Sequence, residues 1–469
     1  MCYSLLLGPA SNSKKEMNIV VERGGYVLRR EMAGRMWYCA LKRKVAGRMW
    51  YCALKRKVAG GMRYCALKRK VTAGICMTLL MGLVLMGCAA QDKKMYTSGI
   101  FAMDTIMELQ VAGHEETLSG AEEIIRHLEK ELSVTDENSE ISRLNINGSA
   151  ELTPDVAGIM EGALKVCRET DGALDISIYP VLKAWGFTTG EYRVPYSAEL
   201  EELLKKVDYR NVAMSDAESA GGTDAGEGNA EGKEAGDNSE EKNVRYGENI
   251  TGTGQNAAGD SSKKSLEGSE DSVTTETSVS AEILPGMEVD LGSVAKGYAG
   301  KAVAEYMKER GVTSALINLG GNVQCVGRKP NGERWKVAIK SPFEESKSGL
   351  FGVLLAEDTA IITSGGYERY FEENGEVYWH ILDPSTGEPA KNGLASVTVV
   401  GSDGLRCDGL STALFVMGLD RAIKFYRVSD GFDAIFITEG GEVYITEGLA
   451  GDFELSSEYY NAPVHILSK

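Results

Sequence analysis

The chain has 469 residues, 43% of them hydrophobic, with 51 basic and 68 acidic side chains and a net charge of −17. Residues 1–87 carry 17 of the bases and only 3 of the acids, so the remainder has 34 bases, 65 acids and a net charge of −31. That balance excludes a nucleic-acid-binding protein, which needs a basic footprint.

Residues 1–87 have the pattern of a targeting region rather than of a folded domain. Lys68-Arg69-Lys70 precedes an apolar run, Ala73 to Met86, that leads into Gly87-Cys88. A charged segment, a short apolar segment and small residues at a cleavage point are typical of a secretory signal, and the run is short for a membrane-spanning helix. The end of the run resembles the bacterial lipobox. We therefore expect lipidated Cys88 to anchor the protein at the extracytoplasmic face of a bacterial cell membrane, with a plain membrane anchor as the alternative.

Before this signal the sequence repeats itself in units of 13 residues: Ala33 to Val45, Ala46 to Val58, and a diverged copy from Ala59 to Val71. Structural repeats are usually longer, because each must form a supersecondary unit. We interpret the copies as a duplicated signal region or as translated sequence upstream of the true start. Met62 would give a signal of ordinary length.

The stretch 214–282 differs in composition from its surroundings. It has 16 acids, 5 bases and a single aromatic residue, Tyr246. Such a segment cannot bury enough apolar surface to offset its ordering entropy, so the composition predicts a disordered acidic insertion. It separates two blocks, 95–213 and 283–469.

The two blocks predict an α+β fold with mixed or antiparallel sheets and packed helices. The first block predicts a strand over Thr105–Val111 and a helix over Leu118–Leu132. Several predicted strands of the second block follow one another without a helix between them, which disfavours a parallel sheet. The predicted helices there are Ala295–Glu309, Leu410–Val416 and Leu419–Val428; the predicted strands are Ala315–Leu319, Trp335–Ile339, Val353–Leu355, Ala360–Ile362, Val377–Ile381, Val397–Val400 and Ala434–Ile437.

Three cysteines follow Cys88, namely Cys167, Cys325 and Cys407, and their scattered positions predict buried thiols rather than a zinc site or a disulfide framework. His114, His127 and His465 stand outside every motif, and we expect them to be structural.

Asp408 and Thr412 are four residues apart at the head of an apolar stretch. On a helix they share one face, and two such oxygens suit a hard cation such as Mg²⁺ that also binds phosphate. His380 opens a turn-rich segment nearby, which suggests phosphoryl chemistry. The alternatives are a capping aspartate with a solvated threonine and a hydrogen-bonded structural histidine.

Asp290 and Lys296 flank a predicted strand-to-helix junction, where helix amides and a lysine charge favour phosphate. A capped helix with a solvated lysine is the alternative. Gly320-Gly321 permits positive φ or a close backbone approach, or is simply a turn.

Eight motifs occur in an order that resembles the FAD:protein FMN transferases, the ApbE-like family of bacterial flavin transferases. The resemblance covers the chain after the signal apart from the insertion, and Asp104 stands where the family often has glycine. The motifs are Phe101-Ala102-Met103-Asp104-Thr105, Ser139 to Asn145, Gly172 to Ser177 with Trp185-Gly186-Phe187, Val289 to Tyr298, Asn318 to Asn322, Thr363 to Arg369, His380 to Pro389, and Asp408 to Thr412.

The resemblance implies a role for each matched residue in an ApbE-like, T-fold-like domain. Asp408, Thr412 and the carbonyl of Ser293 would hold Mg²⁺. Asp290, Lys296 and His380 would contact FAD, with His380 as general base. The flavin or ribityl region would be lined by Met103, Ala173, Leu174 and Asp175.

The expected activity is Mg²⁺-dependent transfer of FMN from FAD to a threonine or serine hydroxyl of a partner protein, with release of AMP. The expected partners are extracytoplasmic flavin-acceptor subunits of membrane redox complexes. Three alternatives remain: an FAD pyrophosphatase using the same site, an FAD-binding lipoprotein without catalysis, and a structural surface lipoprotein.

Overall fold

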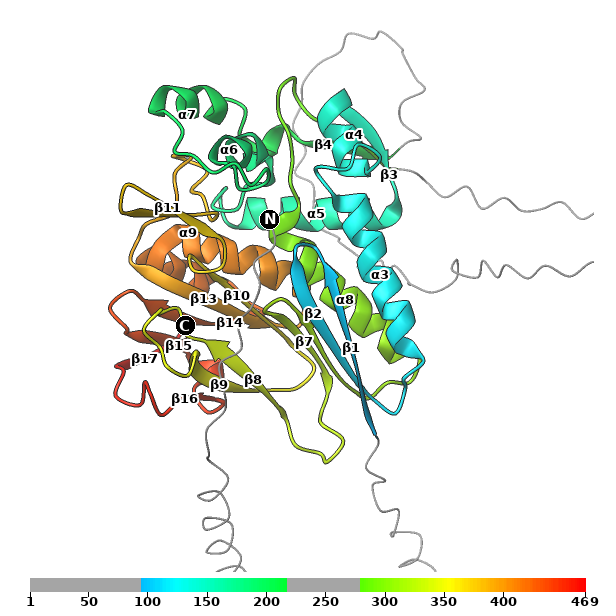
Figure 1. Ribbon diagram of the computed structural model, residues 1–469, viewed down its shortest axis with the longest axis vertical. Coiled ribbons are helices and arrows are strands. Elements are labelled where there is room, and N and C mark those ends of the chain that lie inside the picture. Colours follow the sequence, from blue (N-terminus) through cyan, green and yellow to red (C-terminus); the bar gives the residue numbers. More distant parts are fainter. Residues whose placement is uncertain (1–93, 217–278) are drawn as a thin grey trace, which may run out of the picture. The chain divides into compact units, whose positions relative to one another are not determined.

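The computed structural model describes residues 94–216 and 279–469, which belong to one compact unit. Its centre is a nine-stranded sheet (Figure 1). All of its strand pairs are antiparallel except the last, which confirms the predicted α+β class. In spatial order the strands are β1 (Met95–Ala102), β2 (Thr105–Ala112), β6 (Ser314–Leu319), β7 (Asn322–Gly327), β10 (Ala360–Gly365), β13 (Leu394–Gly401), β14 (Phe432–Thr438), β15 (Val443–Thr446) and β17 (Val464–Leu467).

Both faces of this sheet are covered, because its strands carry apolar residues at odd and even positions alike. Ile362 and Phe436 belong to the larger core, which they share with α8 (Gly292–Glu309) and α9 (Gly404–Val428). The adjacent residues Ile361 and Ile435 point to the opposite face, since side chains alternate along a strand. There they pack against a second, smaller sheet.

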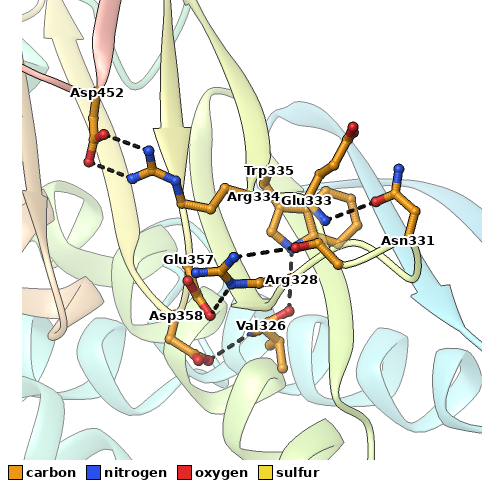
Figure 2. A network of polar contacts seen from close by, with 11 residues as sticks. Val326, Arg328, Asn331, Glu333, Arg334, Trp335, Glu357, Asp358 and Asp452 are labelled. Carbon is orange, nitrogen blue, oxygen red and sulfur yellow. Dashed lines mark hydrogen bonds and ion pairs between the residues drawn. The ribbon is translucent and has the colours of Figure 1, made fainter. Parts of the chain in front are cut away.

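The second sheet consists of β8 (Trp335–Lys340), β9 (Leu350–Ala356) and β16 (Phe453–Leu455). Polar contacts brace this sheet (Figure 2): Arg334, just before β8, holds both carboxylate oxygens of Asp452, just before β16, at 2.6 and 2.7 Å, and Arg328, just after β7, contacts Glu357, just after β9, at 2.7 Å.

The first block supplies helices as well as the edge of the main sheet. These are α3 (Thr117–Leu132), α4 (Glu140–Asn147), α5 (Pro154–Glu169), α6 (Tyr179–Trp185) and α7 (Ser197–Leu204), with short 3-10 turns η1 (Ile176–Ile178) and η2 (Tyr209–Asn211). Because β2 pairs with β6, the two blocks form one sheet instead of separate domains.

The edges of the predicted insertion are themselves strands. Residues 213–216 form β4 (Ala213–Asp216) and residues 279–282 form β5 (Val279–Glu282). Strand β5 pairs with β4 on one side and with β3 (Ser149–Leu152) on the other. The rest of the insertion, the signal region, the repeat and Cys88 lie outside the described residues, so those predictions stay predictions.

An aromatic cluster surrounds the loop of His380. The hairpin of β11 (Tyr370–Glu373) and β12 (Glu376–Trp379) leads into that loop, and Tyr378 packs on Trp185 with ring centroids 5.3 Å apart. The Trp185 indole N–H donates to the carbonyl of Gly387 at 2.7 Å. This contact fixes the far end of the loop and explains how the Trp-Gly-Phe motif serves the site.

The break predicted between two helices after residue 409 is confirmed: the backbone of α9 is non-helical at Gly418 (φ 71°, ψ 167°), between the predicted segments Leu410–Val416 and Leu419–Val428. Two other expectations need correction. The first of these helical segments begins at Gly404 and is capped by Asp403, so Asp408 lies inside the helix and is not its cap. β12 ends at Trp379, so His380 lies in a loop.

Other expectations are confirmed. Cys167, Cys325 and Cys407 are buried free thiols, and burial raises the pKa of each to about 12. Within 94–216 and 279–469, none of the helices combines the length and apolarity that crossing a membrane requires.

Candidate active site

Two adjoining pockets form the candidate site, joined through Lys296, Thr363, Glu368 and Arg369, which line both. Every residue predicted to contact FAD or metal lines one of them. Met103 lines the second pocket; the first is lined by Ala173, Leu174, Asp175, Asp290, Ser293, Lys296, His380, Asp408 and Thr412.

The first turn of α8 brings Asp290, Ser293 and Lys296 to the cavity. No strand precedes this helix directly, contrary to the predicted strand-to-helix junction; residues 283–291 are extended loop and turn. Asn145 holds that loop, because its amide donates to the carbonyl of Val289 at 2.9 Å and accepts from the Val289 N–H at 2.7 Å. This explains the polar motif after the first helix, for which the sequence offered no role.

Asp290 closes the start of α8. Its carboxylate accepts the N–H of Gly292 at 2.8 Å. Burial raises the pKa of this carboxyl, although the Gly292 N–H, Arg369 and Lys296 act in the other direction.

Helix α9 crosses α8 closely enough to place Asp408 against the α8 backbone. An ideal Cβ on Gly297 would lie 2.2 Å from the carbonyl oxygen of Gly404, so only glycine fits there. The Gly297 N–H donates to a carboxylate oxygen of Asp408 at 2.8 Å. In a regular helix the same N–H faces the carbonyl of Ser293, so one backbone group connects two of the predicted metal ligands.

Asp408 is only 6% exposed. Burial raises the pKa of its carboxyl to about 6, and Lys296, the Gly297 N–H and Asn322 offset part of that effect. The amide nitrogen of Asn322 is buried in the same cavity and faces the Asp408 carboxylate without forming a hydrogen bond of good geometry. A buried carboxylate and a buried amide with a free hydrogen are what a site for a polar ligand would contain.

His380 is held by the backbone of Arg369. Its Nδ1 lies 3.2 Å from the Arg369 carbonyl oxygen, which also accepts the His380 backbone N–H at 3.1 Å. The ring of Phe187 meets the imidazole edge-on with centroids 6.3 Å apart. Burial, together with the charges of Arg369 and Lys296, lowers the pKa of His380 to about 3. The imidazole is therefore neutral at pH 7.

Asp175 and Met103, which were predicted to line the flavin region, also help to define the local backbone structure. The Asp175 carboxylate accepts the backbone N–H groups of Ser177 and Tyr209 at 2.9 and 3.0 Å. Met103 and Asp104 form the two-residue turn between β1 and β2 with φ of 47° and 59°. An aspartate tolerates this left-handed conformation better than most residues, which accounts for Asp104 where the family often has glycine.

Gly320 and Gly321 line the second pocket. Of the alternatives open for them, the structure shows positive φ, 69° and 102°, and a close approach at Gly320, where a Cβ would lie 2.3 Å from the hydroxyl of Thr105.

Glu368, Arg369 and Asn322 also line the cavity, and none of them was among the predicted site residues, although each lies within one of the eight motifs. Burial raises the pKa of Glu368, with Lys296 and Arg369 opposing. The signal that could have found them is a pair of glycines just before each: Gly365-Gly366 precede Glu368-Arg369 with Tyr367 between, and Gly320-Gly321 precede Asn322 directly.

The predicted oxygen ligands fit a hard cation. The carboxylate of Asp408, the hydroxyl of Thr412 and the backbone at Ser293 face one cavity, and Mg²⁺ prefers oxygen donors with few protein ligands. Across the described part of the chain there is no group of three or more His, Cys, Asp or Glu side chains suited to a metal. The metal site predicted here has one carboxylate, one hydroxyl and one backbone carbonyl as ligands, so it does not depend on a cluster of three such side chains.

Comparison with known proteins gives a consistent picture. A protein of Klebsiella pneumoniae called FAD:protein FMN transferase is 41% identical over 162 residues, which span 34% of this chain and 49% of that protein. A protein of the same name from Haemophilus influenzae is 27% identical over 359 residues, 74% of this chain and 88% of that protein.

Solved structures share the fold. The ApbE protein of Thermotoga maritima has a TM-score of 0.58 at 26% identity, covering 76% of this chain and 98% of its own. The flavin transferase ApbE of Vibrio cholerae has a TM-score of 0.56 at 20% identity, covering 77% and 99%. The sequence model of the ApbE family matches residues 103–234 and 251–436, more than half of the chain. This chain therefore belongs to the ApbE family.

Proposed function

We propose that this protein is an FAD:protein FMN transferase that moves the FMN part of FAD onto a threonine or serine hydroxyl of a partner protein and releases AMP. The observation that carries the proposal is the meeting of Lys296, Arg369, His380, Asp408 and Thr412 in one cavity of an ApbE-family chain. Cations, oxygen ligands and a neutral imidazole together suit phosphoryl transfer.

The diphosphate of FAD would lie between Lys296 and Arg369, which line both pockets. The N-terminus of α8 adds the positive end of the helix dipole. With the diphosphate in that position, the flavin end of FAD would occupy one pocket and the adenosine end the other.

Mg²⁺ would be held by Asp408, Thr412 and the carbonyl of Ser293, and when bound it would neutralise charge on the diphosphate. The chain contributes the fixed positions of these groups. Asp408 is set by the Gly297 N–H, and its raised pKa means that a cation must displace a proton below about pH 6.

His380 would accept the proton of the attacking hydroxyl. When Nδ1 carries the proton that faces the Arg369 carbonyl, Nε2 is left with a lone pair. The hydroxyl oxygen forms a bond to the FMN phosphorus while the bond to the AMP oxygen breaks. AMP leaves with that electron pair, and the hydroxyl proton ends on Nε2.

The location and partners are part of the proposal. Lipidation at Cys88 would tether the enzyme outside the membrane, where its acceptors would be flavin-binding subunits of membrane redox complexes. The strongly acidic chain is compatible with an acyl anchor that does not rely on a polybasic patch.

The test incubates residues 89–469 with FAD and Mg²⁺, with and without a flavin-acceptor domain, and follows AMP release and acceptor mass. An FMN mass increase on the acceptor supports the transferase. AMP release without that increase identifies a hydrolase, and intact FAD identifies a binding protein. The variant Asp408→Ala should abolish Mg²⁺-dependent turnover; wild-type turnover would remove Asp408 from the metal site.

A further inference from the structure

Two serines lie behind Thr412 and connect it to the rest of the protein. Ser411 is fully buried on α9, and its hydroxyl donates to the carbonyl of Asp408 at 2.8 Å. Ser364, near the end of β10, places its hydroxyl oxygen 2.7 Å from that of Ser411 and 3.3 Å from that of Thr412. The three hydroxyls therefore form a chain that starts at the Asp408 backbone and ends at the cavity.

The hydrogens along this chain can be assigned from its buried end, because a hydroxyl has one hydrogen to donate. We assign the hydrogen of Ser411 to the Asp408 carbonyl, the acceptor on its own helix, and with that assignment Ser364 donates in the 2.7 Å contact. Ser364 then has no hydrogen left for Thr412, and Thr412 donates in the 3.3 Å contact. The oxygen lone pairs of Thr412 are consequently free to face a ligand.

We propose that Ser364 and Ser411 are positioning residues that preform the metal site by turning the lone pairs of Thr412 into the cavity. The inference rests on the metal site of the proposed function. Without Ser364, the Thr412 hydroxyl loses its acceptor and can turn its hydrogen toward the cavity, where a cation would be repelled. Asp408 has the matching support from the Gly297 N–H, so both side-chain ligands are oriented before metal arrives.

A nearby hydroxyl pair provides a control. Thr363 and Thr398 join β10 to β13 through hydroxyl oxygens 2.8 Å apart, and Thr398 is fully buried. Thr398→Val removes a hydroxyl contact of the same type from the neighbouring residue pair of the β10–β13 ladder. It does not alter any residue of α9. A general loosening of the sheet would follow from either substitution, whereas loss of the hydroxyl chain follows only from Ser364→Ala.

The experiment titrates Mn²⁺ alone into residues 89–469, which contain the whole compact unit, and measures free Mn²⁺ by electron paramagnetic resonance. Ser364→Ala should raise the Kd for Mn²⁺ roughly ten-fold, the usual effect of losing a partner of a metal ligand. Ser364→Thr, which keeps the hydroxyl, should restore binding, and Thr398→Val should match the wild type. Thermal unfolding confirms that each variant is folded.

Three results would overturn the inference: unchanged Mn²⁺ affinity in Ser364→Ala, equal weakening in Thr398→Val, or a wild type that binds no Mn²⁺ without FAD. A turnover assay adds a second check, because saturating Mg²⁺ should restore the activity of Ser364→Ala. Failure of that rescue would place Ser364 in contact with FAD instead. If the wild type transfers no FMN but the Mn²⁺ pattern holds, the proposed activity fails and the hydroxyl chain stands.

Discussion

The backbone N–H of Gly297 donates to the carboxylate of Asp408 at 2.8 Å, and this single bond joins α8 to α9 at the candidate metal site. It forms because Gly297 and Gly404 let the two helices touch: a Cβ on either would lie 2.2 or 2.3 Å from the other's carbonyl oxygen. Because Gly297 and Gly404 have no side chains, the two helices approach closely, and this close approach sets the position of the buried Asp408 carboxylate.

Gly297→Ala should push the helices apart. We expect the free energy of unfolding to fall by about 1–3 kcal/mol, the usual range for overpacking, and Mn²⁺ binding to weaken, because the Asp408 carboxylate loses its donor. Urea unfolding and Mn²⁺ titration measure the two effects.

Gly300→Ala is the matched control on the same helix. The nearest atoms to a Cβ there are 3.5 and 3.8 Å away, which is ordinary contact. If both alanines behave alike, the helix crossing does not depend on close approach at Gly297.

The pKa of Asp408 gives a prediction for the metal-free protein. Its folded pKa, about 6, exceeds the ordinary 3.8, so its contribution to stability is present in full below pH 3.8 and is lost as the pH rises through 6. Asp408→Asn keeps an acceptor for the Gly297 N–H but does not titrate. Between pH 3.8 and 7.5 the free energy of unfolding of the wild type should fall by about 3 kcal/mol relative to that of Asp408→Asn. Unfolding in EDTA across that range measures it, and parallel curves would contradict the raised pKa.

Much of the fold could be predicted because hydrophobic periodicity marks single elements. The predicted strand Thr105–Val111 and helix Leu118–Leu132 match β2 and α3 to within one residue. The start of α9 was missed because Gly404 and Gly409 weaken the helical pattern of residues 404–409. The helix there depends on packing with α8.

The candidate site was predictable as a set of motifs but not as a geometry. Asp408 and Thr412 are correctly placed on one helix, yet nothing local indicates that Gly297, 111 residues earlier, holds the carboxylate. The low pKa of His380 likewise arises after folding, from burial first and then from the charges of Arg369 and Lys296. Pairing over such separations is set by tertiary packing, which local patterns do not contain.

The Arg334–Asp452 pair should contribute modestly to stability. The side chains are 33% and 31% exposed, and the two parallel bonds shown in Figure 2 give a better geometry than an ordinary surface pair. We expect a coupling of about 0.5–1 kcal/mol in a double-mutant cycle with Arg334→Ala and Asp452→Ala. Mn²⁺ affinity should not change, and a change would mean that this pair communicates with the site.

The pH dependence of transfer should separate Asp408 from His380. Because the pKa of His380 is about 3, this residue stays neutral throughout the working range. The fall of kcat/KM on the acid side should therefore occur near pH 6, where Asp408 gains a proton and its affinity for metal drops. Raising the Mg²⁺ concentration should move that fall to lower pH, because metal and proton compete.

His380→Gln should lower the transfer rate by about 10²–10⁴-fold, the range for loss of a general base, and leave the position of the acid limb unchanged. His127→Gln, on the exposed face of α3, serves as the control and should transfer FMN like the wild type. An acid limb that ignores Mg²⁺ and disappears in His380→Gln would reverse the assignment and make His380 the titrating group.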